Sequence, residues 1–398
     1  MLKDLIKKFS RKRLPSSLNV LQNNYKDHLF ALVLAGGGGT RLWPKSREKT
    51  PKQFLKLFYN KTLTQITIER FKKILPLSKI FIVTVSEDYK KEILKEIPDF
   101  LPKNIIVEPL RRETGPAHGI GATFIKKQDP DAVIITESAD RLVDPINLYL
   151  KTLTTAAKVA FNDRMLIAVG VKPQYPHTGL GHIKKGKEYI KINDNTFYKV
   201  EKFIEKPPLA LAKKYTKSGN YYWNAGQYVW RADEYLKALD LYEPEISKGL
   251  QEIEKEIDTS RELKTIKEVY EKLPLKTKEG KPLSVDYTVS ERAKNMIVIG
   301  GDFYWSDIGD WKEVWNNLKK DENGNVIIDG EEKGGEIMNI DATDSLIHTN
   351  GRMIAIIDVD NIVVVDTKDS LLICSKSRAQ NVKKIVEELK ARKQKDLL

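Results

Sequence analysis

Short apolar runs that alternate with helix-like stretches constrain the fold of this chain more than any other feature. The apolar runs cover residues 29–35, 79–85, 104–108, 132–136 and 165–171, and the helix-like stretches cover 62–75, 87–97, 116–128 and 145–161. Buried strands spaced by helices are typical of a mainly parallel sheet with helices on both faces. The sequence therefore predicts an α/β fold built on a Rossmann-like sheet.

The pattern loosens beyond residue 172 and changes again near residue 321. Strand-like pieces at 199–205 and 227–232 mix with charged helical stretches at 245–257 and 261–272. Short β-type runs separated by Asn, Asp and Gly then predict a small β-rich, β-helix-like domain, which a helix follows. We expect four segments: a basic leader at 1–28, a catalytic domain at 29–320, the β-rich domain at 321–376 and a C-terminal helix at 377–398.

The net charge of +13 is concentrated at the two ends of the chain. Residues 1–28 carry +5 and residues 377–398 carry +4. Basic ends without a nucleic-acid-binding motif favour solvated tails, so no nucleic-acid partner is expected. No apolar run reaches the roughly 18 residues of a membrane span, so no integral membrane segment is expected. The single cysteine, Cys374, fits a cytoplasmic protein.

A cluster of four glycines directly follows the first apolar run. Residues 36–39 let the backbone approach a ligand closely and can turn several N–H groups toward phosphate oxygens. Arg41 and Lys52 add cations that suit a triphosphate. The P-loop spacing would need Gly-Lys at positions 41 and 42, and the dinucleotide fingerprint would need glycine at 41, so both of these loops are excluded.

The segment AGGGGTRLWPKSREKTPKQFL at residues 35–55 resembles the signature of the sugar-phosphate nucleotidyltransferases, in particular its guanylyltransferase form. Six further segments resemble family motifs in the same order: Glu108-Pro109 with Arg112, Thr114, Pro116 and Ala117; TGLG at 178–181; FIEKP at 203–207; WNAG at 223–226; SVDY at 284–287; and WSDIGDW at 305–311. Seven motifs in order are more specific than any one of them. The chain is thus similar to the mannose-1-phosphate guanylyltransferases, in their monofunctional form without an isomerase domain.

This resemblance implies an enzyme that transfers the GMP moiety of GTP to mannose 1-phosphate and forms GDP-mannose and pyrophosphate with Mg²⁺ as cofactor. It implies catalytic roles for Arg41, Lys52 and Lys206; nucleotide binding by Ala35, Gly36, Gly37, Gly38, Gly39, Thr40, Glu108, Arg112 and Thr114; sugar binding by Gly179, Gly181, Glu205, Asn224, Gly226 and Asp286; and metal binding by Asp140 and Asp307. It leaves the oligomeric state open, a homodimer included.

The residue types in these motifs suit phosphoryl chemistry without a general base. A phosphate oxygen of the sugar 1-phosphate is already anionic at neutral pH, so catalysis of its in-line attack on the α-phosphorus consists of positioning and charge stabilisation. Mg²⁺ commonly takes one or two carboxylates together with phosphate oxygens. A purely structural role also stays open for both aspartates: Asp307 could cap a helix-like stretch at 309–318, and Asp140 could be a turn residue.

The chain departs from the family pattern at several positions. The family's Asn is Glu113, its usual Ala is Gly115, its aromatic residue between two glycines is Leu180, and its Leu-Pro-Ala-Asp-His reads Glu-Ser-Ala-Asp-Arg at residues 137–141. Two alternatives therefore stay open: a nucleotidyltransferase for another base or sugar 1-phosphate, and a non-catalytic regulatory subunit that binds a nucleotide sugar. A nucleic-acid binder that acts through its basic tails is the third alternative.

Overall fold

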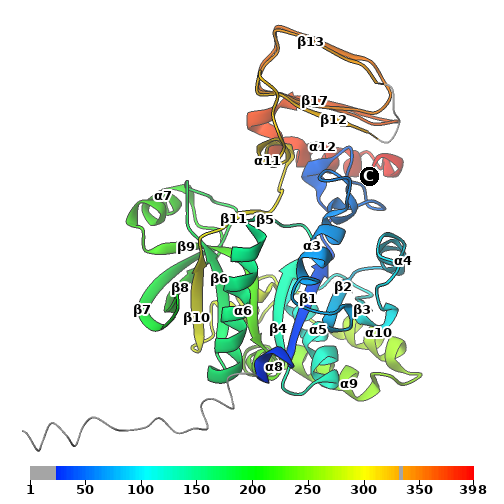
Figure 1. Ribbon diagram of the computed structural model, residues 1–398. Helices are drawn as coiled ribbons and strands as arrows, with labels where there is room; N and C mark the ends of the chain where they lie inside the picture. The colour runs from blue at the N-terminus through cyan, green and yellow to red at the C-terminus, as the bar shows by residue number, and fades with distance from the viewer. Residues whose placement is uncertain (1–23, 331–334) are drawn as a thin grey trace, which may run out of the picture.

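A nine-stranded sheet forms the centre of the molecule (Figure 1). The computed structural model describes residues 24–330 and 335–398, so most of the predicted leader at 1–28 lies outside the described residues. The strand order is β3-β2-β1-β4-β9-β6-β10-β8-β7, and β8 and β9 run against the strands beside them. The strands are β1 (Leu29–Ala35), β2 (Ile80–Thr84), β3 (Ile105–Val107), β4 (Val133–Ser138), β6 (Leu166–Val171), β7 (His182–Ile192), β8 (Asn195–Ile204), β9 (Tyr221–Arg231) and β10 (Met296–Gly301). The predicted mainly parallel, Rossmann-like sheet is confirmed.

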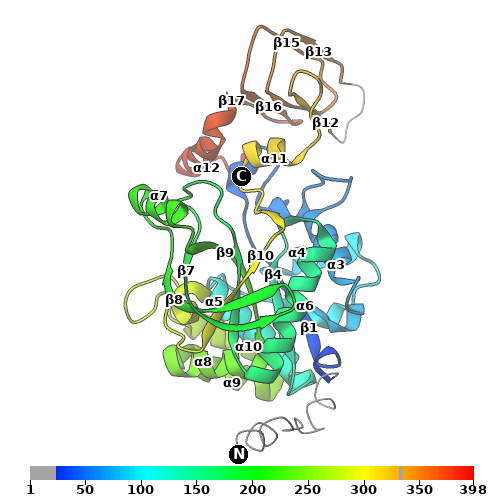
Figure 2. The same cartoon turned by 60° about the vertical axis from the view of Figure 1, so that its left-hand side comes forward.

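Helices cover both faces of this sheet (Figures 1 and 2). Successive side chains of a strand point to opposite faces, so β1 places Ala31 and Val33 in one apolar core and Phe30 and Leu32 in the other. The first core is closed by α3 (Leu63–Phe71), α4 (Glu87–Glu96) and α6 (Ile146–Asp163), and the second by α5 (Thr114–Gln128), α8 (Ala232–Tyr242), α9 (Pro244–Glu256) and α10 (Glu262–Lys272). Because both faces are buried, each large apolar side chain on these strands contributes roughly 1.5–3 kcal/mol to stability.

The register of β1 brings the candidate site residues to one edge of the sheet. β1 pairs in parallel with β2 and with β4, and Leu34 lies opposite Ser138. The N–H of Ala139 donates to the carbonyl of Leu34 over 2.9 Å, which extends the alignment past the end of β4. The glycines after β1 and Asp140 after β4 therefore emerge together, at the carboxyl edge where open α/β sheets bind ligands.

In the half of the sheet beyond β4, the strands are longer than predicted and more of them run antiparallel to their neighbours. The strand-like pieces at 199–205 and 227–232 belong to β8 and β9, which contain 10 and 11 residues. β7 and β8 form a hairpin that projects beside α7 (Leu209–Ser218), and their outward side chains are mostly Lys, Glu and Tyr. Because these strands are largely polar, they do not appear in the sequence as apolar runs. A two-stranded ribbon of β5 (Leu142–Asp144) and β11 (Tyr304–Ser306) lies above the sheet and was also missed.

Stacked β coils form the last part of the chain (Figures 1 and 2). β12 (Val326–Asp329), β14 (Leu346–Thr349) and β16 (Ile362–Asp366) pair in parallel on one side, and β13 (Ile337–Ile340) pairs in parallel with β15 (Ile354–Ile357) on another. The antiparallel strand β17 (Leu371–Ser375) pairs with β16. This arrangement confirms the predicted β-helix-like fold.

The helices α11 (Trp311–Asn317) and α12 (Val382–Ala391) lie between the β coils and the sheet, beside the segment that follows β1. Their apolar side chains share one core with that segment and with the coils. Within the described residues, no helix combines the length and the apolarity needed to cross a bilayer.

A buried ion pair joins α3 to the end of β4. The Arg70 and Glu137 side chains are almost fully buried, and Arg70 Nη2 also donates to the carbonyl of Arg141 over 2.7 Å. Removing one partner leaves the other charge buried and unpaired, which costs about 3–5 kcal/mol. We therefore expect Arg70→Met to lower the free energy of unfolding by about this amount, as measured by urea denaturation.

The matched control is Lys61→Met, since Lys61 pairs with Glu69 on the surface at 2.7 Å. Both of these side chains are exposed, so the change should stay within about 0.5 kcal/mol. Equal effects of the two substitutions would contradict the structural role given to Arg70.

Candidate active site

The glycine-rich loop after β1 folds back on the segment that carries Lys52. Gly39 has a φ of 62°, which favours glycine, and a Cβ atom on it would collide with the Cβ of Lys52. The Ser46 hydroxyl donates to the carbonyl of Gly39 over 2.7 Å, and the Gln53 amide donates to the carbonyl of Ala35 over 3.2 Å. The loop is thus held at both of its ends, and its close packing explains why a glycine is needed at position 39.

A first cavity, here called the phosphate cavity, opens beside this loop and measures about 470 Å³. Its lining includes the predicted residues Gly37, Gly39, Thr40, Arg41, Lys52, Asp140 and Asp307, together with Arg141 and Gly309, and four residues of α12, namely Lys383, Val386, Glu387 and Lys390. Four segments of the chain that are distant in sequence therefore meet around one space that contains both signs of charge.

Lys52 is the centre of the ionic contacts in the phosphate cavity. Its Nζ lies 2.9 Å from Asp140 Oδ2 and also donates to the carbonyl of Asp307. Burial acts to raise the pKa of Asp140, but the nearby charges of Lys52 and Arg141 outweigh it and lower that pKa. Asp140 is therefore a carboxylate at neutral pH.

Asp140 and Asp307 together suit a hard cation. Asp140 Oδ1 is buried and has no hydrogen-bond partner among the described residues. The described part of the chain contains no cluster of three or more His, Cys, Asp or Glu side chains that could hold a metal alone. A cation here would take two carboxylates and complete its shell with phosphate oxygens and water, which is the ligand set that Mg²⁺ accepts.

The structure also tests whether Asp307 caps a helix, which was the alternative to its role as a metal ligand. Asp310 is the residue that caps α11, because its Oδ1 accepts from the backbone N–H groups of Lys312 and Glu313 over 2.9 and 3.1 Å. The N-cap interpretation of Asp307 is therefore wrong. Ile308, with a φ of 43°, turns the chain between the two aspartates and leaves Asp307 in the phosphate cavity.

A second cavity, here called the base cavity, measures about 310 Å³ and continues from the first. Its lining includes the predicted residues Ala35, Gly36, Gly37, Glu108, Arg112, Thr114 and Asp140, together with Arg111 and Glu113. Because Gly37 and Asp140 line both cavities, the two form one continuous site. Gly38 also faces this region, since a Cβ on it would lie 3.8 Å from Arg111 Nη1.

Three polar side chains of the base cavity are held by the helical layer beneath it. Thr114 Oγ1 accepts from the N–H of Val285 over 2.9 Å, and Arg112 Nε donates to the carbonyl of Tyr270 over 3.2 Å. Glu108 accepts from the Tyr270 hydroxyl over 2.9 Å, but burial outweighs this bond and raises the pKa of Glu108 to about 8. At neutral pH Glu108 is therefore mainly a neutral carboxylic acid, which can donate as well as accept.

A third group of polar side chains, here called the sugar cluster, gathers where the start of β7, the end of β8 and the first part of β9 meet the turn that begins at Asp286. Asn224 Nδ2 donates to Asp286 Oδ1 over 3.0 Å, and Lys206 Nζ lies 2.7 Å from Glu205 Oε1. A Cβ on Gly181 would lie 2.6 Å from Glu205 Oε2, so glycine leaves the carboxylate its space. Burial, with the nearby charge of Asp286, raises the pKa of Glu205, and Lys206 opposes this effect.

Arg141 connects the sugar cluster to the phosphate cavity. Its Nε lies 3.5 Å from Asp140 Oδ1, and its Nη1 lies 3.8 Å from Asp307 Oδ2. A Cβ on Gly226 would lie 3.4 Å from Arg141 Nη2, and the guanidinium lies 4.9 Å from the centre of the Trp305 ring. In the sequence, position 141 stands out only as a departure from the family pattern. The signal for its place in the site was a basic residue directly after a candidate metal ligand.

Gly179 belongs to an exposed loop before β7, and it lines neither of the two cavities. Its N–H donates to His177 Nδ1 over 2.9 Å. Burial lowers the pKa of His177, and the charges of Asp307 and Asp310 oppose that shift. The imidazole packs against the Trp223 ring, with the ring centres 5.8 Å apart. Nothing in the sequence pointed to His177, because it has no metal-ligand spacing to other residues.

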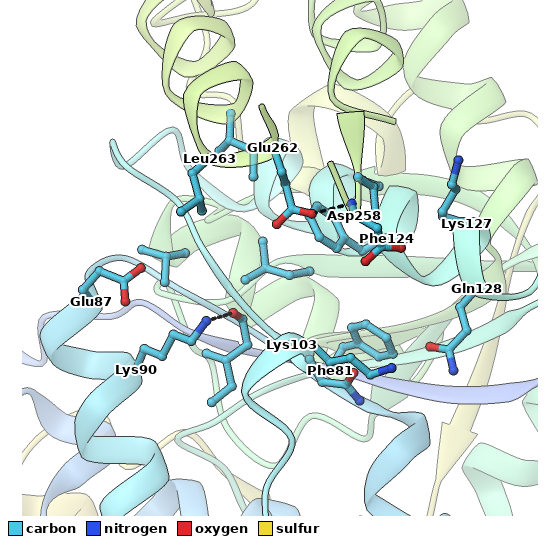
Figure 3. Close-up of a pocket in the computed structure, with 16 residues that line it drawn as sticks. Phe81, Glu87, Lys90, Lys103, Phe124, Lys127, Gln128, Asp258, Glu262 and Leu263 are labelled. Carbon is cyan, nitrogen blue, oxygen red and sulfur yellow. Dashed lines mark hydrogen bonds between the residues drawn. The ribbon is translucent and has the colours of Figure 1, made fainter. Parts of the chain in front are cut away.

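A separate cavity of about 230 Å³ lies at the edge strand β3, between α4 and the start of α10 (Figure 3). Phe81, Phe124 and Leu263 line it, and Lys90 Nζ donates to the carbonyl of Ile105 over 3.2 Å. It contains none of the predicted site residues. The connected cavities at the carboxyl edge are therefore the candidate active site.

Two protein families match the chain. Residues 30–324 match the family described as Nucleotidyl transferase, and residues 335–389 match the MannoseP isomerase/GMP-like beta-helix domain. A mannose-1-phosphate guanylyltransferase of Escherichia coli is 34% identical over 369 residues, which cover 91% of this chain and 75% of that protein. One from Klebsiella pneumoniae is 32% identical over 367 residues, or 91% of this chain and 74% of that protein.

A solved structure is also similar over most of the chain. The crystal structure described as mannose-1-phosphate geranyltransferase from Thermus thermophilus superposes with a TM-score of 0.78 at 29% sequence identity. The superposition covers 91% of this chain and 99% of that chain. The similarity thus includes both the nine-stranded sheet and the β coils.

The raised pKa of Glu108 makes stability depend on pH. The folded protein keeps this proton up to a pH near 8, whereas the unfolded chain releases it near the ordinary value of 4.5. Its contribution to stability is therefore complete below about pH 4.5 and is lost as the pH rises toward 8. From about pH 5 to pH 8, without nucleotide, we expect the free energy of unfolding of the wild type to fall more than that of Glu108→Gln, by on the order of 3 kcal/mol.

Urea denaturation across this pH range measures the difference. Glu252→Gln, on the exposed face of α9, is the matched control and should keep the wild-type profile. Parallel pH profiles for Glu108→Gln and the wild type would contradict the buried, protonated state of Glu108.

Proposed function

Because the chain belongs to the Nucleotidyl transferase family and, within it, to the mannose-1-phosphate guanylyltransferases, we propose that it transfers the GMP moiety of GTP to mannose 1-phosphate. The products are GDP-mannose and pyrophosphate. The observation that carries this proposal is the continuity of the site: the base cavity and the phosphate cavity share Gly37 and Asp140, and Arg141 connects them to the sugar cluster.

The three parts of the site correspond to the three parts of the reacting pair. The base and ribose of GTP would occupy the base cavity beside Glu108, Arg112 and Thr114. The triphosphate would lie against the glycine-rich loop, where backbone N–H groups, Arg41 and Lys52 surround the phosphate cavity. The mannose hydroxyls would contact the sugar cluster described above.

The reaction needs no general base in this arrangement. An oxygen of mannose 1-phosphate attacks the α-phosphorus, a new P–O bond forms, and the bond to the β-phosphate oxygen breaks as pyrophosphate leaves with the electron pair. Lys206 would offset the charge of the attacking phosphate, and Lys52 and Arg41 the charge that develops on the leaving group. Such fixed cations in a partly enclosed site reduce the repulsion between two anions, which is the main barrier to their encounter.

Mg²⁺ is the proposed cofactor, with Asp140 and Asp307 as its protein ligands. Among the described residues, the buried Oδ1 of Asp140 accepts no hydrogen bond and lies 3.5 Å from Arg141 Nε, and this, with the position of both carboxylates in one cavity, supports the assignment. When bound, the ion neutralises charge on the phosphate oxygens. Arg141, which replaces the family's histidine, lies near both carboxylates and lines the same cavity, and this position supports a role in binding a phosphate oxygen.

Asp307→Asn provides the test of this assignment. The substitution keeps the size of the side chain but removes one of two carboxylates from the phosphate cavity, so we expect kcat to fall at least roughly 100-fold. The measurement is pyrophosphate release with GTP, mannose 1-phosphate and Mg²⁺. Asp310→Asn is the matched control, because Asn also caps helices well, and it should keep activity within a factor of a few.

The same assay separates the remaining alternatives. One result would be no release from the proposed pair, but release with ATP, UTP, dTTP or another sugar 1-phosphate. That result would mean that the reaction class is right and that the enzyme acts on other substrates. Silence with every pair despite measurable binding of GDP-mannose would favour the regulatory subunit.

A further inference from the structure

The C-terminal helix α12 is packed directly on the segment that forms the phosphate cavity. Val386 and Leu389 of α12 are buried in the same apolar core as Leu42 and Trp43, which follow the glycine-rich loop. Trp43 Nε1 donates to the carbonyl of Leu397 over 2.8 Å. The apolar face of α12 is thus held against the catalytic part of the molecule, and the position of its other side chains is set by this packing.

A charged stripe of α12 faces the phosphate cavity. Lys383, Glu387 and Lys390 are spaced by four and three residues, which places them on one face of a helix, and all three line the cavity that Arg41 and Lys52 also line. Seven residues of helix rise roughly 10 Å, so the two lysines can reach opposite ends of an extended polyphosphate. Lys384, which is exposed on the same helix, does not belong to this lining.

The charges already paired in the cavity leave the helix lysines available for a ligand. Lys52 is paired with Asp140, and Arg141 lies near Asp140 and Asp307. Over residues 24–330 and 335–398, neither Lys383 nor Lys390 forms an ion pair or a hydrogen bond with another side chain. Lysine is a common phosphate binder, and its flexible side chain can follow a phosphate as it leaves.

We propose that Lys383 and Lys390 bind the β- and γ-phosphates of the nucleoside triphosphate and then the departing pyrophosphate, so that α12 completes the active site. This inference rests on the proposed function. It assigns to α12 a direct part in binding the leaving group, in addition to its contact with the β coils. Glu387, between the two lysines, opposes the anion and limits its affinity, which favours release of pyrophosphate.

The test compares Lys383→Gln, Lys390→Gln and the double variant with Lys384→Gln in the reverse reaction, from GDP-mannose and pyrophosphate. Charge-assisted hydrogen bonds support an effect of about tenfold for each lysine. We expect KM for pyrophosphate to rise about tenfold in the single variants and on the order of 100-fold in the double variant, with KM for GDP-mannose nearly unchanged. Lys384→Gln should stay within about twofold of the wild type, and Glu387→Gln should lower KM for pyrophosphate.

Two results would overturn the inference. One is a wild-type KM for pyrophosphate in the double variant; the other is an equal rise in Lys384→Gln, which would indicate a general charge effect. Thermal unfolding checks that the variants keep the packing of α12, whose apolar face is unchanged. If the wild type turns over no substrate pair, the proposed function fails. The inference can then still be tested by calorimetric titration of pyrophosphate into the same variants, where Kd should rise by the same factors as those expected for KM.

Discussion

The parallel pairing of β1 with β4 is the interaction on which the rest of the site depends. It aligns the last residues of both strands, so that the glycine-rich loop and Asp140 leave the sheet side by side. The Lys52 ammonium group then joins these segments, because it forms an ion pair with Asp140 and donates to the carbonyl of Asp307. A change in this register of one residue would exchange the two faces of β1 and separate the phosphate loop from its carboxylate.

The charges around the phosphate cavity suit the proposed reaction, in which two anions must come together. Cations and carboxylates alternate around the phosphate cavity, so the site is not an uncompensated patch of positive charge. In the proposed reaction, substrate and metal would exchange partners with these groups: the phosphates would take the cations, and the metal ion would take the carboxylates. The base cavity differs in its charge, because burial keeps the Glu108 carboxyl group neutral. Glu108 can therefore form hydrogen bonds with a bound group without adding a charge to the cavity.

Local signals in the sequence were enough to predict the parallel sheet and many of the residues that line the two cavities, because the glycine-rich loop, Glu108 and Asp140 each follow a parallel strand that ends at the same edge. The roles given to those residues remain predictions. Three features had no local signal. The direction of β9 depends on partners far along the chain. The choice between Asp307 and Asp310 as helix cap depends on the backbone of Ile308. The place of the α12 lysines depends on packing between segments that are far apart in the sequence.

The hydrogen bond between Trp43 and Leu397 joins residues 354 positions apart. During synthesis, the strands and helices of the sheet can form as soon as they leave the ribosome, since domains generally fold from the N-terminus as they are made. The core around the segment after the glycine-rich loop is nevertheless complete only with α12, because Val386 and Leu389 are translated much later than its other members near that segment. The lining of the phosphate cavity is therefore complete only once α12 has been made, because Lys383, Glu387 and Lys390 are among the last of its lining residues to be translated.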